Sequence, residues 1–257
     1  MVSPTPAGRA LVDAFDAIRI INLPHRADRR REMAAQFRRL GLDLDHPKIA
    51  FFTAKRFSDA AGFPTPGTRG CFDSHMSVLR EAAEAGHRSV LVLEDDFDFH
   101  DRIETVLPAA LTKLGEVEWD IFFGSLLPGQ YEATECPLEL IPPGKGLAGC
   151  HFYAVRGDTI GFAAHYLAAM LDRPAGGRHP DGEPMHYDGA LSVLRNRHPD
   201  LRTYVANPDL GHQRLSRTDI HDVRFYDRLP VLRTFASLLR RAIRLSGRTR
   251  QMGRKSV

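Results

Sequence analysis

Cysteine is scarce in this chain, with three among 257 residues, at positions 71, 136 and 150. No two of them stand in a Cys-X-X-Cys pair, and an odd number cannot all join in disulfides within the chain. This usage argues against a zinc knuckle and favours a reducing compartment.

Long apolar runs are also missing. The segment from Met1 to Ile18 lacks the continuous apolar stretch of a signal peptide. No segment approaches the roughly 18 apolar residues that a membrane-spanning helix needs. We therefore expect a cytoplasmic protein. Internal repeats and low-complexity segments are absent too, and the length suits one sizeable α/β domain with a short appendage.

Acidic residues are absent from the end of the chain. Residues 228–257 contain nine Lys or Arg and no Asp or Glu, whereas the rest carries 26 basic and 32 acidic residues. Leucines and other apolar residues recur there at helical spacing, which predicts a basic amphipathic helix. Such a helix suits an anionic membrane surface, or it packs on the core of the protein. A nucleic-acid partner is disfavoured, because interleaved aromatics are lacking and the body is acidic.

Strands and helices alternate along the chain, which predicts an α/β fold with a mostly parallel sheet flanked by helices. Strands are expected at residues 17–23, 48–53, 89–93, 119–124, 150–155 and 201–206. Helices are expected at residues 29–40, 71–85, 159–171 and 186–195. The Pro/Gly-rich stretches 126–149 and 173–185 are expected to be long loops, of the kind that often carry function.

Three carboxylates follow directly on an apolar run. The segment Ser89–Leu93 has the composition of a buried strand, and it ends in Glu94-Asp95-Asp96. Open α/β sheets bind their ligands at strand ends. Adjacent acids raise one another's pKa, so a divalent cation between them eases their joint ionisation. We interpret the cluster as a site for a metal ion and a diphosphate. The alternative is a solvated acidic loop.

Four short motifs follow one another along the chain. They are Ile20-Ile21-Asn22-Leu23 with Arg26, Asp28 and Arg29; Gly70-Cys71-Phe72-Asp73-Ser74-His75; Leu93-Glu94-Asp95-Asp96; and Gln213 with Ser216 and Asp219-Ile220. Together they resemble glycosyltransferase family 25, which includes bacterial lipopolysaccharide glycosyltransferases and is similar to procollagen galactosyltransferases. The resemblance covers about residues 17–221. Asp73 and the loose spacing after Gln213 depart from the family pattern.

The resemblance implies a GT-A fold, a UDP-sugar donor, with galactose favoured, and inversion at the anomeric carbon. Carboxylates that hold a divalent cation would neutralise the departing diphosphate. We assign Asp96 to the metal, and Glu94 or Asp95 to metal-bound water or the donor ribose. GT-A enzymes commonly complete the metal shell with a late histidine, which makes His212 a candidate ligand or else a surface residue. A nitrogen ligand would favour Mn²⁺ over Mg²⁺.

An inverting transfer needs a base that takes the proton of the acceptor hydroxyl. Asp188 is our candidate, because it follows a glycine-rich loop near the start of a helix, where the helix dipole keeps it ionised. The alternative is that Asp188 only caps the helix, in which case Glu183 takes the role. Ser74 and His75 are expected to open a helix in capping or packing roles. Cys71 offers no argument for a nucleophile.

Polar residues also follow the first strand, where nucleotides lie in doubly wound sheets. Asn22, Arg26, Asp28 and Arg29 are therefore candidate donor-binding residues, since guanidinium groups suit phosphates. Asn22 could equally be a satisfied strand-end amide, and Arg29 a surface arginine in the first helical turn.

The sequence thus predicts an inverting, metal-dependent glycosyltransferase domain, residues 17–228, followed by a basic tail, residues 229–257. It would move a hexose from a UDP-sugar to a glycan or lipid-linked glycan in surface polysaccharide or lipopolysaccharide synthesis, at the cytoplasmic face of the membrane. One alternative is a non-catalytic protein of the same fold that binds sugar nucleotides or glycans. Another is a nucleotidyltransferase, which the lack of a Gly-rich, lysine-bearing phosphate loop disfavours.

Overall fold

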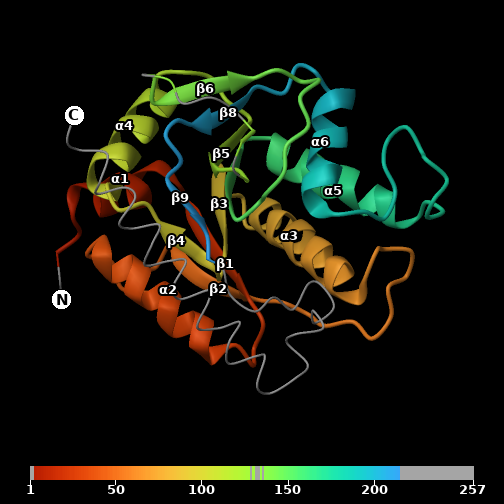
Figure 1. The fold of residues 1–257 in the computed structure, drawn as a ribbon, viewed down its shortest axis with the longest axis horizontal. Helices are drawn as coiled ribbons and strands as arrows, with labels where there is room; N and C mark the ends of the chain where they lie inside the picture. The colour runs from red at the N-terminus through yellow and green to blue at the C-terminus, as the bar shows by residue number, and fades with distance from the viewer. Residues whose placement is uncertain (1–2, 128, 131–133, 135, 215–257) are drawn as a thin grey trace. The chain divides into compact units, whose positions relative to one another are not determined.

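A mixed seven-stranded sheet lies at the centre of the described part of the chain, in the order β2-β1-β3-β7-β5-β8-β6 (Figure 1). The structure is a computed structural model that describes residues 3–127, 129, 130, 134 and 136–214. The strands are β1 (Ala17–Asn22), β2 (Ile49–Thr53), β3 (Ser89–Glu94), β5 (Ile121–Ser125), β6 (Leu138–Ile141), β7 (Phe152–Arg156) and β8 (Thr203–Ala206). β1, β2 and β3 run parallel, as do β5 and β8, while β7 and β6 run antiparallel to their neighbours.

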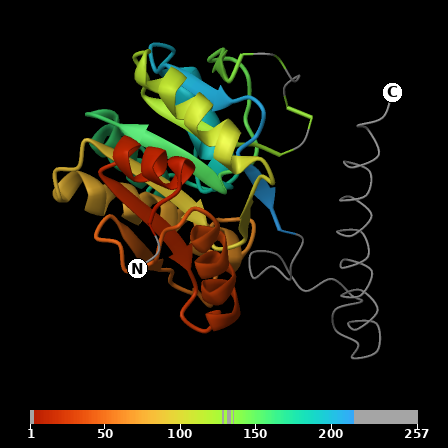
Figure 2. The ribbon, with the colours of Figure 1, turned by 90° about the vertical axis from the view of Figure 1, so that its left-hand side faces the viewer.

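Helices cover both faces of this sheet, as Figures 1 and 2 show. One face carries α3 (Pro66–Glu84), α5 (Thr159–Leu171) and α6 (Tyr187–Arg197), and the other carries α1 (Pro6–Ala14), α2 (Ala27–Arg39) and α4 (Ile103–Gly115). Alternate residues of β3 pack into the hydrophobic cores on the two faces of the sheet, because successive side chains of a strand point to opposite faces. Val90 and Val92 join the core under α3, whereas Leu91 and Leu93 join the core under α4. The predicted α/β class with a mostly parallel, helix-flanked sheet is confirmed.

Helix α3 begins earlier than expected. Thr65 caps it by accepting a hydrogen bond from the Thr68 amide at 3.0 Å, and Pro66 occupies the first turn. The prediction that Ser74 and His75 open this helix is therefore wrong. Both residues lie inside it, and the Ser74 hydroxyl donates to the Gly70 carbonyl at 2.6 Å.

A second, two-stranded sheet follows directly on the acidic cluster. It pairs β4 (Phe97–Phe99) with β9 (Gly211–Gln213) antiparallel. A Cβ on Gly211 would lie 2.2 Å from the Asp98 carbonyl oxygen, so only glycine allows this approach. The pairing brings the end of the described chain to the tip of β3. Neither strand was expected, and β6 lies inside the stretch that was predicted to be a loop.

The described residues form one unit that ends at Arg214. Several predictions lie outside them, namely the basic C-terminal helix, the boundary between residues 228 and 229, and the motif residues Ser216, Asp219 and Ile220. Among the helices that the structure describes, none combines the length and the hydrophobicity that a bilayer crossing requires.

Candidate active site

The tips of β1 and β3 place the first and third motifs together. The two strands are parallel neighbours, with Ile21 beside Glu94, so their carboxyl ends share one edge of the sheet. Asn22 is fully buried and its amide donates to Asp95 Oδ2 at 2.6 Å. Asn22, which was predicted from the sequence, thus forms a hydrogen bond with the acidic cluster.

Arg29 reaches the same cluster from the first turns of α2. One of its terminal nitrogens lies 2.5 Å from Asp95 Oδ1 and 3.0 Å from Asp96 Oδ2. The three side chains are buried, and buried charges persist only where partners compensate for the lost water. Asp95 receives two strong donors, Asn22 and Arg29, which hold its carboxylate in a fixed orientation.

Asp96 is less well compensated than Asp95. Its Oδ1 atom is buried and has no hydrogen-bond partner among the described residues, while its Oδ2 atom lies 3.4 Å from the Gln213 amide. Burial, reinforced by the charge of Glu94, raises the pKa of Asp96 to about 7. The side chain therefore has an unused acceptor that a proton or a cation can fill.

Glu94 faces the α3 side of the sheet, where His75 meets it. His75 Nε2 lies 3.3 Å from Glu94 Oε1, and His75 Nδ1 lies 3.2 Å from the Tyr153 hydroxyl. Burial raises the pKa of Glu94, but the His75 hydrogen bond and nearby positive charge outweigh it and hold that pKa below its usual value. The negative charge of the cluster is therefore carried by Glu94 in preference to Asp96.

Asp188 lies in the first turn of α6, as expected. Its Oδ2 accepts from the Gly149 amide at 3.1 Å, and its Oδ1 accepts from the Gly189 amide at 2.8 Å. Burial raises the pKa of the Cys71 thiol well above its usual value, and the charges of Glu94, Asp188 and Asp96 raise it further. Asp188 therefore belongs to the same electrostatic environment as the acids at the β3 tip.

Comparison with known proteins agrees with this arrangement. The family model described as glycosyltransferase family 25 (LPS biosynthesis protein) matches residues 15–127. Procollagen galactosyltransferase 1-B of Xenopus laevis is 25% identical over 220 residues, which cover 77% of this chain and 34% of the relative. The probable inactive glycosyltransferase 25 family member 3 of Rattus norvegicus is 25% identical over 235 residues, which cover 77% of this chain and 38% of the relative.

The predicted resemblance to glycosyltransferase family 25 is confirmed. The chain spans about a third of the length of the curated relatives that it matches. Among solved structures, a glycosyltransferase involved in the glycosylation of the major capsid of PBCV-1 aligns with a TM-score of 0.42 at 11% identity, over 75% of this chain and 82% of that chain.

The motifs that resemble glycosyltransferase family 25 converge on the tip of β3. The first motif contributes Asn22 and Arg29, and the second contributes His75. The third motif is the acidic cluster itself, and Gln213 of the fourth contacts Asp96. Segments that are far apart in the sequence therefore build one polar site.

The structure shows different contacts for the other predicted site residues. Arg26 forms an ion pair with Asp28 at 2.9 Å, and hydrogen bonds from Arg26 lower the pKa of Asp28 to about 2 despite the opposing effect of burial. His212 is exposed and stands opposite Asp98 in the β4–β9 pair. Glu183 accepts from the amides of Gly176 and His179, within its own loop.

Helix α6 also holds the loop that carries Gly149. Ser192 accepts from the Leu147 amide at 2.9 Å. Arg195, fully buried, donates to the Lys145 carbonyl at 2.9 Å and to the Pro142 carbonyl at 3.0 Å. Together with Asp188, these residues recur at helical spacing, so one face of α6 fixes the backbone from residue 141 to residue 149.

The sequence analysis missed His75 as a site residue. A usable signal was present, because Cys71 and His75 are four residues apart and so share one face of a helix. Tyr153 and Tyr187, whose hydroxyls lie 2.8 Å apart beside His75, gave no comparable signal. They come from β7 and α6, and only the folded chain brings them together.

Proposed function

We propose that this chain is a glycosyltransferase of GT-A type that transfers a hexose, with inversion, from a UDP-sugar. The convergence of the family 25 motifs on a buried acidic cluster with an unused carboxylate oxygen carries this proposal. Galactose is the favoured sugar, because matched relatives are named procollagen galactosyltransferases. The acceptor we favour is a glycan or a lipid-linked glycan, with a collagen-like protein as the competitor that those names suggest.

The donor set at the β3 tip fits a hard divalent cation, Mn²⁺ or Mg²⁺. Within the described residues, Asp96 Oδ1 is a buried acceptor without a partner, and burial together with the charge of Glu94 raises the Asp96 pKa. Asp96 and Glu94 would hold the ion, with His212 as the further ligand that the family resemblance suggests. When bound, the ion supplies charge neutralisation for the departing diphosphate.

The remaining residues would position the two substrates. Arg29 and Asn22 keep Asp95 in place, and Arg26 and Asp28 lie at the start of α2, where a nucleotide is expected. Asp188 would accept the proton of the acceptor hydroxyl, with Glu183 as the substitute. The amides of Gly149 and Gly189 donate to the two carboxylate oxygens of Asp188 and hold its side chain in place.

A second candidate function is sugar-nucleotide binding without transfer. Two observations favour it. Both oxygens of Asp188 already accept backbone hydrogen bonds, as a purely structural residue would, and Arg29 occupies one side of Asp95 and Asp96. One matched relative is also named as probably inactive.

Nucleotide release from a panel of UDP-sugars tests both functions. Each donor is incubated with Mn²⁺, with Mg²⁺ or with EDTA, and with a lipid-linked glycan, a free glycan or a collagen peptide as acceptor. We expect acceptor-dependent UDP release that is largest with UDP-galactose and is lost in EDTA. Donor binding without release would establish the second function, and the absence of any UDP-sugar binding would contradict both.

We further propose that the chain works at the cytoplasmic face of a membrane, with its basic segment on the lipid surface. The support is the charge pattern of residues 228–257, which contain nine Lys or Arg and no acid. A lipid-linked acceptor would be presented at that surface.

A further inference from the structure

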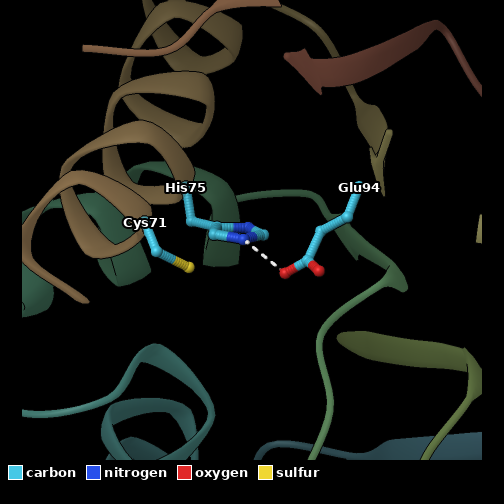
Figure 3. A group of neighbouring side chains, drawn as sticks. All are labelled: Cys71, His75 and Glu94. Atoms are coloured by element: carbon cyan, nitrogen blue, oxygen red, sulfur yellow. Dashed lines mark hydrogen bonds and ion pairs between the residues drawn. The ribbon is translucent and has the colours of Figure 1, made fainter. Parts of the chain in front are cut away.

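A thiol, an imidazole and a carboxylate meet beside the acidic cluster. The ligand atoms of Cys71, His75 and Glu94 all lie within 4.8 Å of one another. Figure 3 shows Cys71 and His75 projecting from the same side of α3 towards Glu94 at the end of β3. Cys71 and His75 are neighbours because residues i and i+4 lie on the same face of a helix, and Glu94 comes from the end of β3.

These three groups suit a different ion from the one proposed at Asp96. Thiolate and imidazole are ligands of Zn²⁺ and similar borderline ions, whereas Mg²⁺ and Mn²⁺ prefer oxygen. Three protein ligands with an open fourth position are typical of zinc sites that also bind water or a substrate. We propose that Cys71, His75 and Glu94 form a Zn²⁺ site.

The surroundings of His75 support its role as a ligand. Its ring stacks on Tyr187 with 4.3 Å between ring centroids, and Nδ1 lies 3.2 Å from the Tyr153 hydroxyl. When Nδ1 carries the proton and donates it to Tyr153, Nε2 has a free lone pair for the ion. A hydrogen bond to the second nitrogen fixes metal-bound histidines in this way.

The charge around Cys71 also favours a cation. Burial raises the pKa of the Cys71 thiol, and the charges of Glu94, Asp188 and Asp96 raise it further, so a thiolate without a counter-ion is disfavoured. Zn²⁺ displaces the thiol proton to solvent and binds the resulting thiolate, so a bound dication would relieve this repulsion. Of the other two cysteines, Cys136 is exposed, and Cys150 is buried in the core, where burial and the charges of Asp188 and Glu94 also raise the pKa of its thiol.

Glu94 belongs to both the zinc site and the proposed hard-metal site. Zn²⁺ at Cys71 would therefore withdraw Glu94 from the donor site and inhibit transfer. This consequence rests on the proposed function, whereas the zinc site itself does not.

Co²⁺ is the probe that tests the site without any enzyme assay. Titration of the full chain with Co²⁺ should produce the near-ultraviolet absorption of a thiolate–Co²⁺ bond, which stoichiometric Zn²⁺ should remove. Cys71→Ser should abolish the band, and His75→Gln should weaken Co²⁺ binding by at least about tenfold. Cys136→Ser should retain the band, and so should Asp96→Asn, which removes no ligand of the proposed Zn²⁺ site.

A second measurement avoids substitution in the site altogether. Alkylation of the wild-type thiols, mapped by mass spectrometry, should show that Zn²⁺ protects Cys71 and leaves Cys136 reactive. A missing charge-transfer band in the wild type, its survival in Cys71→Ser, or equal alkylation of Cys71 with and without Zn²⁺ would each overturn the proposal. Failure of UDP-sugar binding would leave all three results unchanged, so the two proposals fail separately.

Discussion

Asp95 and Asp96 are adjacent in sequence, yet they occupy opposite electrostatic situations. Asp95 accepts from Asn22 at 2.6 Å and from Arg29 at 2.5 Å. Asp96 shares Arg29 at 3.0 Å but retains a buried oxygen that accepts no hydrogen bond from the part of the chain that the structure describes. The protein therefore places one carboxylate in an ion pair with two donors and leaves its neighbour less well compensated, which agrees with the proposed role of Asp96 as a metal ligand.

The pKa of Asp96 predicts a pH dependence of stability in metal-free protein. Its folded-state pKa is raised to about 7 from an ordinary value of 3.8, so the folded chain binds this proton more tightly than the unfolded chain does. The contribution of Asp96 to stability is thus greatest below pH 3.8 and is lost as the pH rises towards 7. The slope is at most about 1.4 kcal/mol per pH unit.

Asp96→Asn cannot ionise and should lack this loss. As the pH rises between these values, urea unfolding in EDTA should show that the free energy of unfolding of the variant increases relative to that of the wild type. At neutral pH the variant should be the more stable protein. Asp28→Asn is the control, because the pKa of Asp28 is lowered to about 2 and its side chain is 53% exposed. A variant of Asp96 that is less stable than the wild type at neutral pH would contradict the assignment.

Asp188→Asn tests the proposed base. Asparagine keeps the size of the side chain and one oxygen for the Gly149 amide, but it cannot accept a proton. Turnover should fall by roughly 10²–10⁴, with near-normal UDP-sugar affinity. The comparison is Glu183→Gln, because the Glu183 carboxylate accepts hydrogen bonds from amides of its own loop. Loss of turnover in Glu183→Gln alone would transfer the role to Glu183.

The sequence was sufficient to predict the residues of the site that lie at strand ends. Asn22 and the three acids could be predicted because a strand tip has a fixed place in a parallel sheet. The helical spacing of Cys71 and His75 was a usable signal, but the contact of His75 with Glu94, 19 residues away on another element, could not be predicted. Its role depends on where α3 begins, and that is set by the cap at Thr65.

At the scale of elements, helix α6 acts as the support of the loop 141–149. Arg195 is the main residue in this support, with bonds to Thr203 Oγ1 at 2.7 Å and to the carbonyls of Ile141, Pro142 and Lys145. Burial lowers the pKa of Arg195 to about 10, so the guanidinium stays charged at neutral pH. The carbonyl dipoles of the loop compensate this charge, and the hydrogen bonds to these carbonyls hold the loop against the helix.

Arg195→Met should therefore destabilise the fold by on the order of 3 kcal/mol, because buried carbonyls lose a charged donor. Urea unfolding measures the change, and limited proteolysis should detect cleavage between residues 141 and 149. Arg197→Met is the matched control on the same helix. Arg197 is exposed in its pair with Asp181, so its loss should cost at most about 1 kcal/mol. Equal effects of the two substitutions would contradict this account.

Elements with strong periodicity were predicted closely, and short edge elements were not. Helix α5 has the expected bounds, and the strands of the parallel core differ by a few residues at their ends. β6 was missed because it is a four-residue edge strand with Leu140 exposed, so its composition resembles that of a loop. β4 and β9 were missed because strands of three residues carry too little pattern to detect.

At the scale of the whole molecule, charge is divided between an acidic body and a basic end. The proposal that residues 229–257 bind anionic lipid predicts co-sedimentation with vesicles that contain phosphatidylserine, weakening as salt rises. A chain that ends at Leu229 should lose this binding. Neutral phosphatidylcholine vesicles are the control. Undiminished sedimentation of the shortened chain would contradict the proposal.

The central claim is that the acids at the β3 tip bind a metal ion and a nucleotide diphosphate. Calorimetric titration of UDP in the presence of Mn²⁺ tests it most directly, with the wild type compared with Asp96→Ala. Circular dichroism should show that both chains are folded, because Asp96 lies at a strand tip and its removal relieves repulsion with Glu94. The account predicts Mn²⁺-dependent UDP binding by the wild type and none by Asp96→Ala. Equal UDP and Mn²⁺ binding by the two proteins would contradict it.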